Sequence, residues 1–242
     1  MRALVIAVLA VVLLAACGGR EGHPTVYAAT SLTEAFERLA PDARFNFAGS
    51  DELARQLEEG ARADVYASAD PRYALRLFRE RLVERPRALV ANQVVLAVPT
   101  SNPARIGSIH DLARPGVKLV LGAPGVPVGD YARRALARRA DGPSITRRVV
   151  SEEQDVKAVL AKLELGEADA GFVYASDVDA AKGKVRAVYP AVADAVYAIA
   201  VVRSGDGDRA KAFLHRVFSR EGRRALLRAG FVGVPTAGEP LP

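Results

Sequence analysis

Small hydroxyl residues follow two β-rich segments of this sequence, at positions where a helix is expected to begin. Thr30 and Ser31 come directly after residues 25–29, and Ser50 comes shortly after residues 44–48. The first turn of a helix has unpaired backbone N–H groups and a partial positive charge, so it attracts anions without any charged side chain. The two segments therefore predict an anion site built from backbone N–H and hydroxyl donors.

Both serines also have a purely structural interpretation. Residues 31–34 read Ser-Leu-Thr-Glu, which is the capping-box pattern, and Ser50 precedes two acidic residues that suit a first helical turn. Taken alone, Ser31 is better explained as a helix cap than as a ligand group, and Ser50 is also a plausible N-cap.

Three further segments are candidates of the same kind. The loop 122–129 has three glycines that allow a backbone to approach a ligand, but it lacks the lysine and hydroxyl of a P-loop and the dinucleotide-binding pattern. Asp155 and Val156 stand at a predicted helix start, and Tyr174 ends a predicted strand. Each of these three, taken alone, favours a structural role.

The elements that must position these residues alternate between β-rich and amphipathic helical segments, which is typical of an α/β fold with parallel strands. Two such sets, with crossings expected near Val98 and Ile199, indicate two lobes that share two strands and can hinge. A single doubly wound sheet is the alternative. We predict strands at 25–29, 44–48, 64–68, 93–98, 118–121, 171–174 and 196–202, and helices at 32–39, 53–60, 71–78, 130–140, 156–163, 210–218 and 221–228.

The N-terminal residues indicate export. A basic start is followed by an uncharged apolar run over residues 3–16, which is shorter than the roughly 20 residues of a membrane-spanning helix and predicts a signal peptide. Cys17 is the only cysteine, and the small residues before it resemble the lipoprotein cleavage box, so we expect a lipid anchor there. The alternative is that Cys17 belongs to a discarded signal.

The predicted organisation follows from these boundaries. Residues 1–16 form the signal peptide, 17–24 the lipidated cysteine and linker, 25–98 and 200–234 lobe one, 99–199 lobe two, and 235–242 a tail. We expect a membrane-anchored lipoprotein, monomeric, that faces the periplasm or the cell exterior.

Composition argues against several other functions. The formal net charge is +6, but the paired arginines are scattered and lack interleaved aromatic residues, which argues against nucleic-acid binding. The nucleophile pattern G-x-S-x-G is absent, and three scattered histidines do not suggest a site for a free metal ion. We therefore expect no catalysis and no cofactor.

Five motifs occur together in an order that resembles the periplasmic molybdate-binding proteins of ABC transporters. The resemblance covers residues 25–234 and implies a two-lobed type II periplasmic-binding-protein fold, with two mostly parallel sheets flanked by helices and a two-strand hinge. The motifs are YAATSL at 27–32, FAGS at 47–50, ADVYASAD at 63–70, VPVGDYA at 126–132 and GFVYASD at 171–177.

The resemblance also implies a ligand set. The family's binding groups fall on Ser31, Ser50, Val128, Val156 and Tyr174, of which the valines give backbone N–H groups and the others give hydroxyls. The implied function is capture of molybdate or tungstate and delivery to an ABC permease. Sulfate or phosphate as the ligand, or a sensor without transport, are the alternatives.

Two residues depart from the family pattern. Asp51 stands where a small hydroxyl residue is expected, and Ala198 replaces a proline. A carboxylate that points into the site would repel molybdate but could accept the proton of hydrogen phosphate. We expect Asp51 to face solvent, and Asp155 raises the same question.

Overall fold

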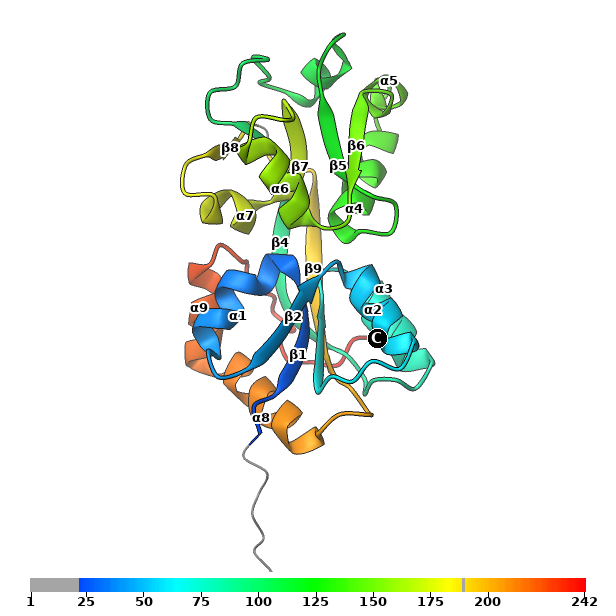
Figure 1. Ribbon diagram of the computed structural model, residues 1–242, viewed down its shortest axis with the longest axis vertical. Helices are drawn as coiled ribbons and strands as arrows, with labels where there is room; N and C mark the ends of the chain where they lie inside the picture. The colour runs from blue at the N-terminus through cyan, green and yellow to red at the C-terminus, as the bar shows by residue number, and fades with distance from the viewer. Residues whose placement is uncertain (1–21, 189) are drawn as a thin grey trace, which may run out of the picture.

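Two long strands join the two lobes of this protein (Figure 1). The computed structural model describes residues 22–188 and 190–242. Strands β4 (Arg87–Pro99) and β9 (Ala193–Val201) run from one lobe into the other and pair antiparallel with each other. The predicted signal peptide and Cys17 lie outside the described residues, so export and lipidation stay predictions.

The lower lobe in Figure 1 contains both ends of the described chain. Its sheet has the order β2-β1-β3-β9, in which β1 pairs parallel with both β2 and β3. The strands are β1 (Thr25–Ala29), β2 (Arg44–Ala48) and β3 (Val65–Ser68), and the helices are the 3-10 turn Thr30–Leu32, α1 (Thr33–Leu39), α2 (Ser50–Glu58), α3 (Pro71–Arg79), α8 (Gly207–Phe218) and α9 (Arg220–Arg228).

The upper lobe has a similar arrangement of strands and helices. Its sheet continues from β4 in the order β7-β5-β6, with β5 parallel to both neighbours, and β8 pairs with β4. The strands are β5 (Leu119–Gly122), β6 (Val149–Glu153), β7 (Ala170–Tyr174) and β8 (Val185–Ala187), and the helices are the 3-10 helix Ile109–Ala113, α4 (Pro127–Ala137), α5 (Gly142–Thr146), α6 (Val156–Glu164) and α7 (Ala175–Ala180).

The predicted α/β fold with two lobes and a two-strand hinge is confirmed. Because β4 and β9 belong to both lobes, the two sheets are joined into one continuous hydrogen-bonded path. The pairing of β4 shifts register between Ala88 and Ala91, and from Val94 onward β4 pairs with β7 of the upper lobe. We therefore propose a lobe boundary in β4 near Ala91, earlier than the expected crossing near Val98.

The C-terminal residues lie along the first part of β4. Gly238 donates its N–H to the Ala88 carbonyl at 2.7 Å, and Val232 and Ala91 exchange backbone hydrogen bonds at 2.8 Å in each direction. The segment expected to be a tail is therefore hydrogen-bonded to the start of a hinge strand.

Asp64 connects two elements of the lower lobe through its buried carboxylate. Its carboxylate is 6% exposed and accepts the backbone N–H of Thr25 at 2.7 Å and that of Asp206 at 2.6 Å. Hydrogen bonds to an ionised acceptor are stronger than neutral ones, and loss of the acceptor would leave both N–H groups unpaired. The carboxylate therefore ties the start of β1 to the start of α8.

We expect Asp64→Ala to lower the free energy of unfolding by about 3 kcal/mol, because two backbone donors lose a charged partner. Urea denaturation of the soluble chain measures this change. Asp208→Ala is the matched control, since the Asp208 side chain is 99% exposed, and it should change stability little. An equally small effect of both substitutions would contradict the anchoring role.

Candidate functional site

One small cavity lies where the two lobes meet, and all five residues implied by the resemblance line it. Ser31 and Ser50 come from the lower lobe, and Val128, Val156 and Tyr174 come from the upper lobe. The remaining lining residues are Ala29, Thr30, Ala48, Gly49, Ala69, Val126, Pro127 and Asp155. The space open to the centre of a water molecule is ≈ 10 Å³, so the lobes are nearly closed around it.

Each of the five residues stands at a junction between a strand and a helix. Ser31 lies in the 3-10 turn before α1, Ser50 begins α2, Val128 is the second residue of α4, Val156 begins α6, and Tyr174 precedes α7. Helix starts carry backbone N–H groups without intrahelical partners, together with a partial positive charge. The cavity is therefore surrounded by groups that donate hydrogen bonds.

The side chains of the two serines do not cap their own helices. The Ser31 hydroxyl lies 2.7 Å from the Tyr197 hydroxyl, and the Ser50 hydroxyl accepts the N–H of Ala69 at 3.0 Å. Neither α1 nor α2 has a side-chain cap at its N-terminus. The capping interpretation of both serines is therefore wrong, because each hydroxyl is held by a residue remote in the sequence.

The Tyr174 hydroxyl is buried and has no hydrogen-bond partner among the described residues. The side chain as a whole is 1% exposed. Burial raises the pKa of Tyr174 well above its ordinary value, so the hydroxyl keeps its proton. A buried hydroxyl without a partner is unfavourable, which indicates that a polar ligand belongs beside it.

Asp155 lines the cavity, but its carboxylate has a structural partner. Its side chain accepts the N–H of Ala158 at 3.0 Å and so caps helix α6. Asp155 therefore stabilises the helix whose first residue is Val156.

Asp51 is half-buried, which corrects the expectation that it faces solvent. It does not line the cavity, and its Oδ1 atom is buried and has no hydrogen-bond partner among the described residues. Burial raises the pKa of Asp51, and the negative charges of Glu52 and Asp130 add to this effect. The carboxylate faces the contact with the upper lobe, where Gly125 lies close to its Oδ2 atom.

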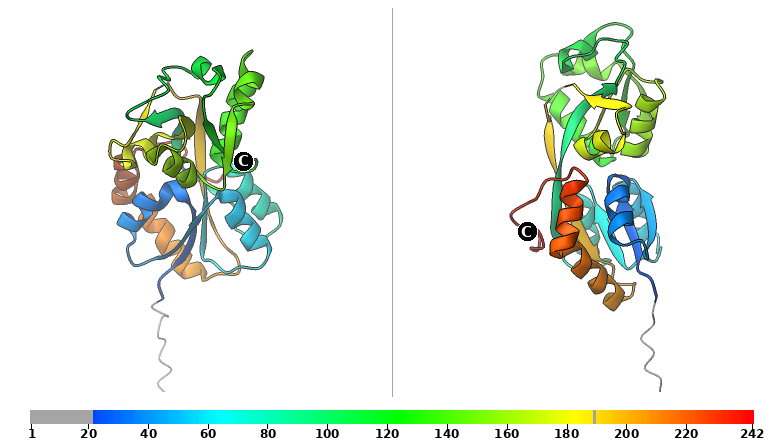
Figure 2. Two further views of the ribbon diagram at one scale, coloured as in Figure 1. Left: turned by 45° about the horizontal axis from the view of Figure 1, so that its top comes forward. Right: turned by 90° about the vertical axis from the view of Figure 1, so that its left-hand side faces the viewer.

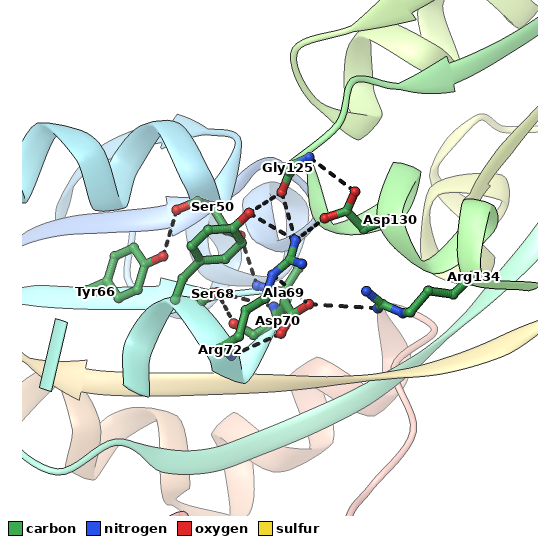
Figure 3. Close-up of polar contacts among 10 residues, drawn as sticks. Ser50, Tyr66, Ser68, Ala69, Asp70, Arg72, Gly125, Asp130 and Arg134 are labelled. Carbon is green, nitrogen blue, oxygen red and sulfur yellow. Dashed lines mark hydrogen bonds and ion pairs between the residues drawn. The ribbon is translucent and has the colours of Figure 1, made fainter. Parts of the chain in front are cut away.

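A polar network joins the lobes beside the cavity (Figure 3). Arg72 at the start of α3 forms an ion pair with Asp130 and donates to the carbonyl of Gly125 at 3.0 Å. The Tyr73 hydroxyl donates to the same carbonyl, and Asp70 lies 3.9 Å from Arg134. Since α3 belongs to the lower lobe and residues 125–134 to the upper lobe, these contacts stabilise the closed arrangement.

Another ion pair joins α1 of the lower lobe and α6 of the upper lobe (Figure 1). Lys157 lies 2.7 Å from Glu34 of the lower lobe and 3.3 Å from Asp177 of its own lobe. Asp177 is 1% exposed and accepts the N–H of Tyr174 at 3.1 Å. Burial raises the pKa of Asp177 to about 6, although Lys157 opposes the shift.

Gly49 permits the lobes to approach each other. A Cβ atom at this position would lie 2.7 Å from the carbonyl oxygen of Gln154 in the upper lobe. Real Cβ atoms do not make so short a contact with a backbone oxygen. The absence of a side chain at residue 49 is therefore a requirement for this degree of closure.

Sequence reasoning did not find several of these partners. Tyr197, Arg72 and Lys157 contact residues far away in the sequence, so no local motif marks them. The sequence does contain an indication for Tyr197. A tyrosine within a long apolar strand is expected to be buried, and a buried tyrosine hydroxyl usually has a hydrogen-bond partner.

Comparison with known proteins places the chain in a family. Residues 24–232 match the family model for bacterial extracellular solute-binding proteins. The chain belongs to this family. It is therefore a solute-binding protein rather than an enzyme. Within residues 22–188 and 190–242, no helix has the length and apolar character needed to cross a membrane.

The names of individual relatives are more specific than the family description. The molybdate-binding protein ModA of Mycobacterium tuberculosis is 39% identical over 220 residues, which cover 85% of this chain and 83% of the relative. ModA of Escherichia coli is 32% identical over 230 residues, or 87% and 89% of the two chains. The periplasmic molybdate-binding protein of Azotobacter vinelandii shares the fold, with a TM-score of 0.77 and 18% identity over 88% of this chain and 100% of that one.

We expect Gly49→Ala to prevent full closure, since the added methyl group would collide with the Gln154 carbonyl. Small-angle X-ray scattering with saturating molybdate, the ligand named for the relatives, should give a larger radius of gyration than the wild type. Gly207→Ala is the matched control, because a Cβ there meets no atom within 4 Å. Equal radii for the Gly49 variant and the wild type would refute the steric argument.

Proposed function

We propose that this protein captures molybdate, or the chemically similar tungstate, outside the cytoplasmic membrane and delivers it to an ABC permease. The observation that carries the proposal is the cavity whose lining includes Ser31, Ser50, Val128, Val156 and Tyr174. We assign these five as the ligand groups, with hydroxyl donors from three and backbone N–H donors from the two valines. The match to molybdate-binding relatives supports this assignment.

The chemistry of the lining suits a fully deprotonated oxyanion. Within the part of the chain that the structure describes, no lysine or arginine lines the cavity, and the one acidic lining residue, Asp155, caps a helix. A tetrahedral dianion has four oxygens that accept hydrogen bonds, so its charge is distributed over several neutral donors. This avoids the burial of a counter-ion and the desolvation that such an ion would require.

Binding and closure are coupled in this proposal. The donors come from both lobes, so an anion held between them makes all its hydrogen bonds only when the lobes are closed. A ligand that binds the closed state more tightly shifts the equilibrium towards that state. The permease then distinguishes the loaded protein by its closed shape.

The proposal includes attachment to the membrane. We infer that Cys17 carries the lipid anchor and that residues 18–24 tether a monomeric two-lobed body to the surface. The apolar run before Cys17 supports this, and membrane extraction of the full-length chain compared with Cys17→Ser tests it.

The proposed ligand is tested by isothermal titration of the soluble chain from Gly18 onward with molybdate, tungstate, sulfate and phosphate. We expect tight binding of molybdate and tungstate and none of phosphate. Sulfate has the same charge but is smaller, so a preference for sulfate would keep the fold and contradict the ligand. Absence of binding by all four would contradict the transport function.

We expect Ser31→Ala and Tyr174→Phe each to weaken molybdate binding by roughly 10- to 100-fold, because each removes one hydrogen bond to a charged ligand worth about 1.5–3 kcal/mol. The same titration measures the change. Ser101→Ala and Tyr27→Phe are the matched controls, since neither residue lines the cavity. Unchanged affinity in both site variants would show that the assignment of the site is wrong.

A further inference from the structure

The hydroxyl of Tyr197 contacts a proposed ligand group without lining the cavity itself. Tyr197 lies on the hinge strand β9, is fully buried, and has its hydroxyl oxygen 2.7 Å from that of Ser31. Its ring packs edge-on against Tyr174 and Phe231, with ring centres 5.8 and 5.3 Å away. The position of the Tyr197 hydroxyl is therefore fixed, and the open question is which of the two hydroxyls donates.

Asn92, on the other hinge strand, is one of the groups that influence Tyr197. Its Oδ1 atom accepts the backbone N–H of Gln93 at 2.9 Å, and a backbone N–H can only donate. The amide orientation is therefore fixed, and the Nδ2 group donates to Ser176 at 2.7 Å. Interaction with the Asn92 side chain lowers the pKa of Tyr197. A hydroxyl has a single proton, so a Ser31 hydroxyl that donates to an acceptor-only oxyanion must accept from Tyr197, whose hydroxyl oxygen lies 2.7 Å away.

We propose that Tyr197 is a positioning residue that turns the Ser31 hydroxyl proton towards the bound oxyanion. Donation then runs in one direction, from Tyr197 to Ser31 and from Ser31 to the ligand. This inference rests on the proposed function, because it requires a ligand that only accepts hydrogen bonds. Successive hydrogen bonds of this kind polarise and strengthen one another.

The arrangement also affects selectivity between oxyanions. Hydrogen phosphate carries a proton that needs an acceptor, whereas molybdate and sulfate carry none at neutral pH. While Tyr197 donates to Ser31, the Ser31 proton points at the ligand. A ligand O–H group at this position would then meet a second donor instead of an acceptor. Without the Tyr197 hydroxyl, Ser31 can rotate and accept that proton.

Burial keeps the Tyr197 hydroxyl protonated. The pKa of Tyr197 is raised well above its ordinary value by burial, while its contacts with Ser31 and Asn92 lower it. The donor is therefore present throughout the neutral pH range. Its place on β9 also ties the orientation of Ser31 to one of the two strands that form the hinge.

The test is a double-mutant cycle between Tyr197→Phe and Ser31→Ala, with molybdate and phosphate affinities measured by isothermal titration. We expect Tyr197→Phe to weaken molybdate binding about fivefold to tenfold and to raise the affinity for phosphate relative to molybdate. In the Ser31→Ala background, Tyr197→Phe should change molybdate affinity less than about twofold, since the hydroxyl it orients is gone.

Tyr66→Phe is the matched control. Tyr66 is equally buried, but its hydroxyl donates to the backbone carbonyl of Ser50 at 2.7 Å rather than to a ligand hydroxyl. Its loss should lower the thermal unfolding midpoint and leave the ratio of molybdate to phosphate affinity unchanged. Thermal unfolding of every variant establishes that each is folded.

The outcomes separate this inference from the proposed function. Titration of the wild type with the oxyanions decides the function, and the cycle can be run with sulfate if sulfate is the ligand. Wild-type affinity in Tyr197→Phe, or an equal loss in both backgrounds, overturns the positioning role alone. A wild type that binds none of these oxyanions overturns both.

Discussion

The structure depends on one constraint, which is that hydrogen-bond donors from neutral groups must converge where the lobes meet. Parallel strands meet this constraint, because their carboxyl ends lie at one edge of a sheet and each leads into a helix start. Strands β1 and β2 lead to Ser31 and Ser50, while β5, β6 and β7 lead to Val128, Val156 and Tyr174. Two small parallel sheets that face each other across a hinge therefore produce the cavity without any dedicated binding domain.

Basic side chains lie outside the lining of the cavity, among the described residues. Arg72 of α3 and Lys157 of α6 form ion pairs between the lobes, and their side chains are 41% and 26% exposed. Partly exposed ion pairs each contribute little, typically about 1 kcal/mol or less, so they align the lobes without locking them. Figure 2 shows that the lobes are connected by extended strands along one side, which leaves the rest of the interface free to open.

Much of this could be predicted from the sequence, and the failures have physical reasons. The periodicity of apolar residues and the positions of strand ends located the main elements, and the resemblance to molybdate-binding proteins supplied the five cavity residues. Strand β6 was missed because residues 149–153 are half polar, and β8, α5 and α7 are too short to give a period. The interpretation of Ser31 as a helix cap was wrong because its hydroxyl contacts Tyr197, 166 residues away in the sequence. The expectation that Asp51 faces solvent was wrong because its surroundings include the opposite lobe.

The Tyr174 hydroxyl links anion binding to closure of the two lobes. In the closed arrangement its hydroxyl is buried without a partner among the described residues, which is unfavourable by about 1–3 kcal/mol. Opening the cleft exposes this group to water, and a bound anion provides an acceptor in the closed state. Closure without a ligand therefore carries a penalty that closure around an anion does not. Among the three hydroxyls of the proposed ligand set, Ser31 and Ser50 already have protein partners, so this penalty falls on Tyr174. In the proposed function, the penalty makes the closed shape a signal that the site is occupied.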